Sequence, residues 1–129
     1  MNTRMPPVLV PHYRKELAAA RQKFAARDLL ASWRHLERAH IIGQAYPVAH
    51  SAVHLRMLAF GIQIKSTREI LGQIPRLLVG GVKSFVGRIP VGNTGGADVP
   101  ALQSMPIPAD LSAVLALAPA RNPSSLPLL

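Results

Sequence analysis

The sequence contains no cysteine and few aromatic residues. Without cysteine the chain can form no disulfide, no thiolate metal site and no cysteine nucleophile. Trp33 is the one tryptophan, and no stretch alternates polar and apolar residues as a half-buried strand would. Up to Arg88 the chain is instead dominated by Ala, Leu, Arg, Gln and Lys, which favour helix. We therefore expect the 129 residues to form one all-α domain.

Long uninterrupted apolar runs are also missing. The most apolar later stretch, residues 70–87, contains Arg76 and Lys83 and lacks the continuous length of a membrane span. The N-terminal residues MNTRMPPVLVPHYRK hold a short apolar run cut by prolines, which does not resemble a signal peptide. We therefore predict a cytoplasmic protein without a membrane span.

Acidic residues are scarce, with six Asp and Glu against 15 Lys and Arg and a net charge of +9. Residues 1–88 carry 14 of the basic residues and four of the acids. Basic helical domains bind nucleic acid, anionic membranes or acidic partners. The chain has no run of Lys and Arg and no DNA-reading motif, so a solvated basic face is the simpler interpretation. We do not expect a nucleic-acid partner.

Four helices are expected before residue 89. The spacing of apolar residues predicts them over residues 11–27, 28–44, 47–64 and 66–87, after an irregular arm at 1–10. Asp28 can cap the second helix, and Ser66, with Glu69 three residues later, can cap the fourth. Pro75 should kink or split the fourth helix. Short turns make successive helices antiparallel, so we predict a four-helix pair of tetratricopeptide-like αα-hairpins.

From residue 89 the chain becomes rich in glycine and proline. We expect residues 89–118 to be an extended segment that packs on the helices, with a short helix over 109–118, and residues 119–129 to be disordered. The motif PVGNTGG (residues 90–96) favours tight turns, and its backbone N–H groups can also meet an anion. It lacks the Gly-Lys-Ser/Thr ending of a P-loop. We interpret it as a structural loop made of Gly92, Asn93, Thr94, Gly95 and Gly96.

The second and third predicted helices carry an unusual set of polar residues on their apolar faces. Glu37 and His40 lie three residues apart on one helix, and His50 and His54 lie one turn apart on the next. Because the helices should be antiparallel, the four side chains are expected to converge near one end of the hairpin. Imidazole and carboxylate groups bind divalent transition metals. The sequence therefore predicts a metal site of Glu37, His40, His50 and His54, with Glu16 as a further ligand.

Other interpretations of these residues remain open. The histidines can pair with Glu37 and with backbone carbonyls as satisfied polar groups of the core. The Glu-x-x-His unit at residues 37–40 also occurs in bundle-type di-iron sites, which need two such units where the chain has one. No nucleophile–base pair is visible, so we do not expect an enzyme, although a metal with an open position could activate water.

Several segments resemble a bacterial family labelled domain of unknown function 3703. They are HLERAHIIGQ (35–44), HSAVHLRML (50–58), PVGNTGG (90–96) and MPIP with the following Ala-Asp-Leu (105–111). The resemblance covers most of residues 8–118. It implies a small single-domain protein with no established catalytic residues, and a link to heavy-metal resistance genes.

The leading hypothesis is a small cytoplasmic accessory protein that binds a divalent transition metal and acts in heavy-metal resistance. The alternative is a metal-free adaptor whose helical groove binds a protein or peptide partner.

Overall fold

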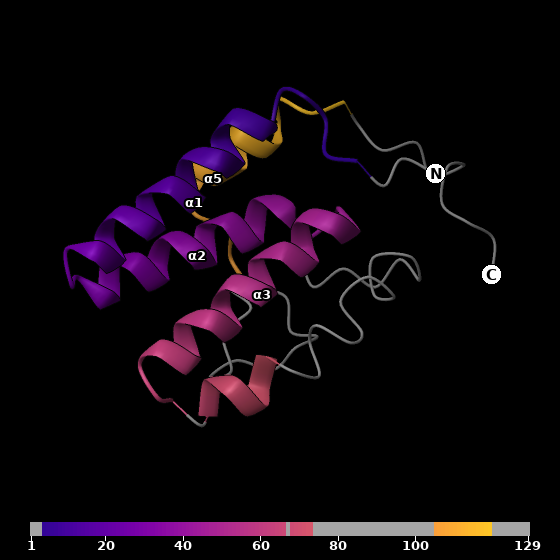
Figure 1. Cartoon of the computed structure of the whole chain (residues 1–129). Helices are drawn as coiled ribbons and strands as arrows, with labels where there is room; N and C mark the ends of the chain where they lie inside the picture. The colour runs from indigo at the N-terminus through magenta and orange to yellow at the C-terminus, as the bar shows by residue number, and fades with distance from the viewer. Residues whose placement is uncertain (1–3, 67, 74–104, 120–129) are drawn as a thin grey trace, which may run out of the picture.

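Helices joined by short turns make up most of the computed structural model, which describes residues 4–66, 68–73 and 105–119 (Figure 1). The helices are α1 (Val10–Ala25), α2 (Leu29–Gly43), α3 (Pro47–Gln63) and α5 (Ala109–Leu115), and residues 68–73 are also helical. No strand occurs among these residues. The all-α prediction is therefore confirmed for the described part of the chain.

Local capping explains where the helices begin. The Asp28 carboxylate accepts a hydrogen bond from the amide of Ala31 at 3.2 Å, as predicted for the N-cap of α2. Pro47 occupies the first position of α3, where its missing N–H leaves no helical bond unmade. Ser66 Oγ accepts from the amide of Glu69 at 3.4 Å and so caps the helical residues 68–73. These helix starts are set locally, by Pro47 itself and by contacts between residues three apart in the sequence.

Helices α1 and α3 end in the same way. Arg27 and Lys65 have φ angles of 62° and 59°, the left-handed conformation that commonly follows a helix. The amides of the next residues, Asp28 and Ser66, donate back to carbonyls of the last helical turn at 2.9 Å and 2.8 Å. Each of these residues then caps the following helix, so both turns reverse the chain within a few residues.

The predicted tail is described only in part. Residues 105–108 have no regular structure, and α5 lies within the predicted 109–118 helix. Pro75, the PVGNTGG motif and residues 120–129 lie outside the described residues. Most of the fourth predicted helix lies there too, so the tetratricopeptide-like pairing stays a prediction.

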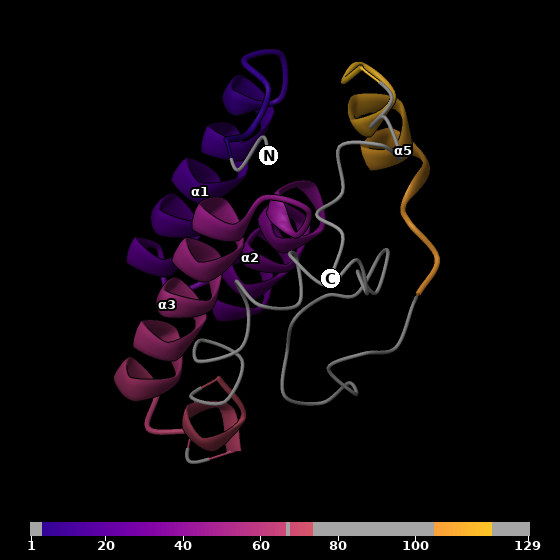
Figure 2. The ribbon, with the colours of Figure 1, turned by 90° about the vertical axis from the view of Figure 1, so that its right-hand side faces the viewer.

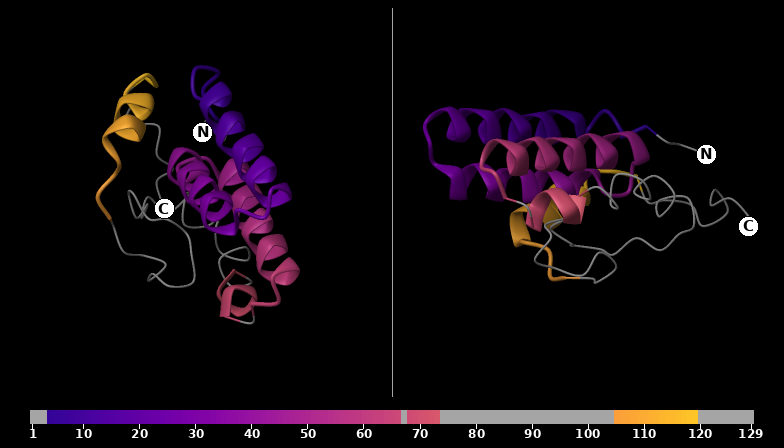
Figure 3. Two further views of the ribbon diagram at one scale, coloured as in Figure 1. Left: turned by 90° about the vertical axis from the view of Figure 1, so that its left-hand side faces the viewer. Right: turned by 60° about the horizontal axis from the view of Figure 1, so that its bottom comes forward.

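Helix α2 is the central element, because it contacts α1, α3 and α5. Figures 2 and 3 show α1 and α5 on opposite sides of α2. Apolar side chains from all four helices meet around it and form one core. Its buried members are Leu9, Tyr13, Leu17, Ala20, Leu36, Ala39, Ile41, Ile42, Tyr46, Val53, Met57, Phe60 and Leu111.

Two hydrogen bonds hold α1 against α2 and against α3. Ser32 Oγ on α2 donates to the carbonyl of Ala20 on α1 at 2.7 Å, inside the core. The Tyr13 hydroxyl on α1 donates to the carbonyl of Ala49 on α3 at 2.9 Å. Burial raises the pKa of Tyr13 to about 12, although Arg56 acts in the opposite direction. Together these bonds fix the position of α1 on the hairpin formed by α2 and α3.

No helix in the described part of the chain is both long and apolar enough to cross a membrane.

Candidate metal centre

Three histidines meet between α2 and α3. His40 comes from the last turn of α2, and His50 and His54 lie one turn apart in the first half of α3. The Nε2 atom of His40 lies 3.0 Å from that of His50 and 3.1 Å from that of His54, and the last two are 3.0 Å apart. All three side chains are buried, with at most 4% exposed. The Nε2 atoms thus form a nearly equilateral triangle, here called the histidine triangle.

The three imidazole rings are arranged around a common centre. Their centroids lie 4.6–4.8 Å apart, and each pair of ring planes meets at 63–75°. The rings are therefore neither stacked nor coplanar, and each presents its Nε2 edge to the other two. The spacing of His50 and His54 accounts for part of this arrangement, because residues four apart lie on the same face of a helix.

Hydrogen bonds alone cannot satisfy the histidine triangle. An imidazole nitrogen carries either a hydrogen or a lone pair, and never both. In any triangle of such atoms, at least two must therefore carry the same group and face each other at about 3 Å. Adding protons to remove lone pairs would place positive charge in a buried site, which is costly. A single cation at the centre resolves the conflict, because it accepts all three lone pairs.

A second layer of side chains fixes the orientation of His54. The amide oxygen of Gln73 lies 2.6 Å from Nδ1 of His54, and since that oxygen can only accept, Nδ1 donates. The amide nitrogen of Gln73 donates in turn to Oε2 of Glu69 at 3.1 Å, which supports this assignment of the amide. With its hydrogen on Nδ1, neutral His54 presents a lone pair on Nε2. Metal-binding histidines typically have such an outer partner.

The size of the histidine triangle suits a first-row metal ion. At a metal–nitrogen distance of about 2.05 Å, nitrogens at tetrahedral angles lie about 3.3 Å apart, and those at right angles about 2.9 Å apart. The observed distances of 3.0–3.1 Å fall between these values. Shifts of a few tenths of an ångström would therefore give either geometry, and small rotations about the side-chain torsions of a histidine move its Nε2 atom that far.

The structure brings together three of the four predicted ligands. His40, His50 and His54 form the group that could hold a metal ion, and Glu37 does not belong to it. Glu37 is half-buried on α2, one turn before His40. Its role as a ligand stays a prediction.

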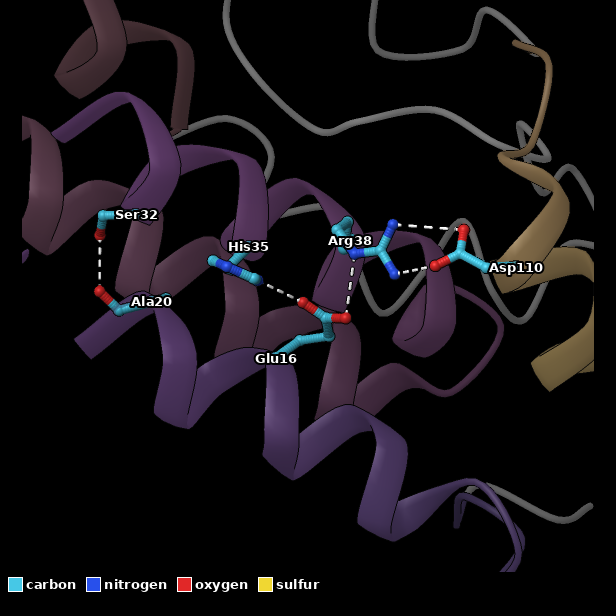
Figure 4. Close-up of polar contacts among 6 residues, drawn as sticks. All are labelled: Glu16, Ala20, Ser32, His35, Arg38 and Asp110. Atoms are coloured by element: carbon cyan, nitrogen blue, oxygen red, sulfur yellow. Dashed lines mark hydrogen bonds and ion pairs between the residues drawn. The ribbon is translucent and has the colours of Figure 1, made fainter. Parts of the chain in front are cut away.

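The prediction that Glu16 adds a ligand was wrong. Its carboxylate binds Nδ1 of His35 at 2.6 Å and Nε of Arg38 at 2.9 Å, and it does not belong to the histidine group (Figure 4). The i, i+3 spacing of His35 and Arg38 on α2 was the available signal, because it places both on one face toward α1. The sequence alone did not give the rotation of α2 about its axis, which decides which histidine Glu16 meets.

Arg38 extends this polar cluster to α5. Its Nη1 atom donates to Oδ1 of Asp110 at 3.3 Å, and its Nη2 atom contacts Oδ2 (Figure 4). The hydrogen bond from Arg38 lowers the pKa of Asp110, and the bond to Asp110 raises the pKa of Arg38. The exposed Asp110 thus helps to fasten α5 to α2, beside the buried Leu111. The cluster links α1, α2 and α5 through side-chain contacts, and none of its residues belongs to the histidine triangle.

The model of the family described as Protein of unknown function (DUF3703) matches residues 8–115. The chain belongs to this family. The matched DUF3703 region contains the three histidines, Gln73 and the polar cluster of Glu16 and Arg38. No curated protein and no solved structure matches the chain.

Proposed function

We propose that this DUF3703 protein binds one divalent transition-metal ion through the Nε2 atoms of His40, His50 and His54. The observation that carries the proposal is the histidine triangle, whose three buried nitrogens cannot all hydrogen-bond to one another. Neutral imidazole suits zinc, copper, nickel and iron. Zinc is the natural first probe, because it accepts the geometry offered by the ligands.

The charge of the site favours an additional anionic ligand. Three neutral imidazoles leave the two positive charges of the ion uncompensated inside the protein, which is unfavourable. We propose Glu37 as that ligand, because it lies one turn before His40 on the same helix. A carboxylate there would complete a four-coordinate ion. A Glu37→Gln variant that retains wild-type affinity and stoichiometry would remove Glu37 from the site.

We further propose that the protein is a cytoplasmic accessory factor in heavy-metal resistance. The support for this role is the burial of the three histidine ligands, which suits retention of an ion better than its chemical use. A protein of this kind would sequester or pass on metal and would not be an enzyme. Deleting the coding sequence and measuring growth in zinc, copper and nickel tests the role, and unchanged tolerance of all three would contradict it.

Metal binding itself is tested on purified, untagged protein. Zinc is titrated against a chromophoric chelator, beside elemental analysis of the protein as isolated. We expect one ion per chain in the wild type and loss of that ion in His50→Ala/His54→Ala. His12→Ala and His35→Ala are matched controls, since neither residue belongs to the group, and both should retain the ion. Absence of binding with zinc, copper, nickel and iron(II) would overturn the proposal.

The adaptor hypothesis has its own structural support. A groove between α1 and α3 lies at the opposite end of the helices from the histidines, and the two sites share no residue. A partner could bind there whether or not metal is present.

A further inference from the structure

A groove runs between the second halves of α1 and α3, with α2 at its base. Its cavity volume is 340 Å³, and its lining is mostly apolar, with Leu17, Ala20, Phe24, Leu36 and Phe60. A second hollow of 630 Å³ continues it past Leu29 and Ile64 and shares Phe24, Ala25 and Gln63 with it. We call the two together the α1–α3 groove.

The charged residues along the α1–α3 groove are all of one sign. Arg21 and Arg56 line the first part and Arg27 the second, and no acidic residue is among the lining side chains. All three arginines are exposed. Within the described part of the chain, their guanidinium groups form no ion pair and no hydrogen bond. This contrasts with Arg38, which binds two carboxylates.

Four of the acids near these helices already have other contacts. Glu16 binds His35 and Arg38, and Asp28 caps α2. Glu69 accepts from Gln73, and Asp110 binds Arg38. The groove arginines therefore lack an internal counter-charge from these four acids. Guanidinium groups bind carboxylates through paired hydrogen bonds, so an acidic partner would supply what these four acids do not.

We propose that the α1–α3 groove binds an acidic peptide segment of a partner protein. An apolar side chain of the peptide packs over Phe24 and the edge of Phe60, and its carboxylates reach Arg21 and Arg56 on the two walls. A nucleic acid fits less well, because single strands stack on several exposed aromatic rings, whereas Phe60 is only 7% exposed and Phe24 is partly buried. The proposal is independent of the metal site.

Trp33 provides a built-in reporter for this groove. It is the one tryptophan of the chain, and its ring lies 5.0 Å from that of Phe60, centroid to centroid. Phe60 in turn lies 5.4 Å from Phe24. A ligand that covers the two phenylalanines should therefore change the fluorescence of Trp33, so that binding in the groove can be told from binding elsewhere.

The experiment uses the full chain and two sets of fluorescein-labelled peptides without tryptophan. Both sets carry leucine and phenylalanine anchors at helical or extended spacing, and the intervening residues are glutamate in one set and lysine in the other. Anisotropy gives the affinity, and Trp33 emission of unlabelled copies gives the location. We expect at least one glutamate peptide to bind, lysine peptides not to bind, and the affinity to fall with added salt.

Arginine variants test which charges matter. Arg21→Gln/Arg56→Gln should weaken binding of the glutamate peptide about tenfold, as expected for two exposed charge pairs. Arg14→Gln/Arg34→Gln removes the same charge from exposed positions outside the groove and should have a much smaller effect. Arg21→Glu/Arg56→Glu should lose the glutamate peptide and gain a lysine peptide. This gain also shows that the variant is folded.

Several results would overturn the proposal. They are failure of every glutamate peptide to bind, equal binding of both charge types, and equal losses in the groove and control variants. Binding of dodecanoate or of anionic vesicles in place of any peptide would instead assign the groove to a lipid.

The His50→Ala/His54→Ala variant tests whether the two sites are separate. We expect it to lose zinc binding and to retain peptide binding.

Discussion

His54 donates its Nδ1 hydrogen to the amide oxygen of Gln73 at 2.6 Å, and this contact determines which ring nitrogen faces His40 and His50. The proton on Nδ1 leaves Nε2 of neutral His54 with a lone pair at the histidine triangle. Gln73 is fully buried and is itself held by Glu69. Gln73, in the helical residues 68–73, thereby orients His54 on α3 for metal binding.

Replacing Gln73 should weaken the metal site without removing a ligand. In Gln73→Leu the Nδ1 hydrogen of His54 loses its acceptor, so the ring is less well oriented and less basic. Loss of such outer partners typically lowers metal affinity 10–100-fold. Competition with a chromophoric chelator measures the change, and Gln22→Leu on the exposed side of α1 is the control. Equal affinities in wild type and Gln73→Leu would show that the contact does not serve metal binding.

Gly43 should not tolerate a side chain. A Cβ atom there would lie 2.9 Å from Cε2 of Tyr13 and 3.2 Å from Cβ of Ala49, inside the packed contact of α1, α2 and α3. We expect Gly43→Ala to lower the free energy of unfolding by about 1–3 kcal/mol, measured by urea denaturation. Gly61→Ala is the comparison, because its closest contact, at 3.1 Å, is with Cβ of Glu69 in the next helix. A fully stable Gly43→Ala would mean that the three helices separate more easily than their packing indicates.

Tyr13 should make the fold sensitive to alkali. Its pKa is raised to about 12 in the folded protein because burial disfavours the phenolate. The stabilisation is therefore complete below the unfolded pKa of about 10 and is lost as the pH rises towards 12. Urea unfolding should show wild-type stability falling faster over this range than that of Tyr13→Phe. Tyr13→Phe should itself be about 1 kcal/mol less stable at neutral pH, because Ala49 loses a hydrogen bond. Parallel pH profiles would contradict this account.

Asp110 should contribute stability at neutral pH and lose it in acid. Arg38 lowers its pKa in the folded state, so the contribution is present above the unfolded value of about 3.9. It disappears as the pH falls through the lower folded value. Asp110→Asn should therefore be less stable than wild type near neutrality and equal to it in strong acid, as followed by urea unfolding. The neutral difference should shrink with salt. A difference that persists unchanged in acid would mean that the charge of Asp110 plays no part.

Much of the helical architecture could be predicted because its determinants are local. Asp28, Pro47 and Ser66 start helices by contacts within a few residues, and the structure places the first three helices within two residues of the predicted bounds. The pairing of His50 and His54 also follows from one helical turn. The approach of His40 to both needed only an antiparallel hairpin, which the short turn at residues 44–46 imposes.

The remaining features depend on how helices rotate about their axes. Sequence spacing gives the level of a residue along a helix, but packing of α2 between α1 and α5 sets its rotation. That rotation turns His35 and Arg38 towards Glu16 on α1, and Glu16 is not part of the metal-ligand group. The contact of Gln73 with His54 could not be predicted from the sequence either, because the position of Gln73 depends on the path of the chain after Ser66. Its spacing of four from Glu69 was the one local signal.

The central claim is that three imidazoles hold one metal ion. X-ray absorption at the zinc edge tests it most directly, on wild-type protein and His50→Ala/His54→Ala incubated with zinc and freed of excess. We predict a zinc signal in the wild type with nitrogen neighbours at about 2.0 Å and the multiple-scattering pattern of three imidazoles, and no protein-bound zinc in the variant. A wild-type spectrum without imidazole scattering, or the same spectrum from both proteins, would contradict the claim.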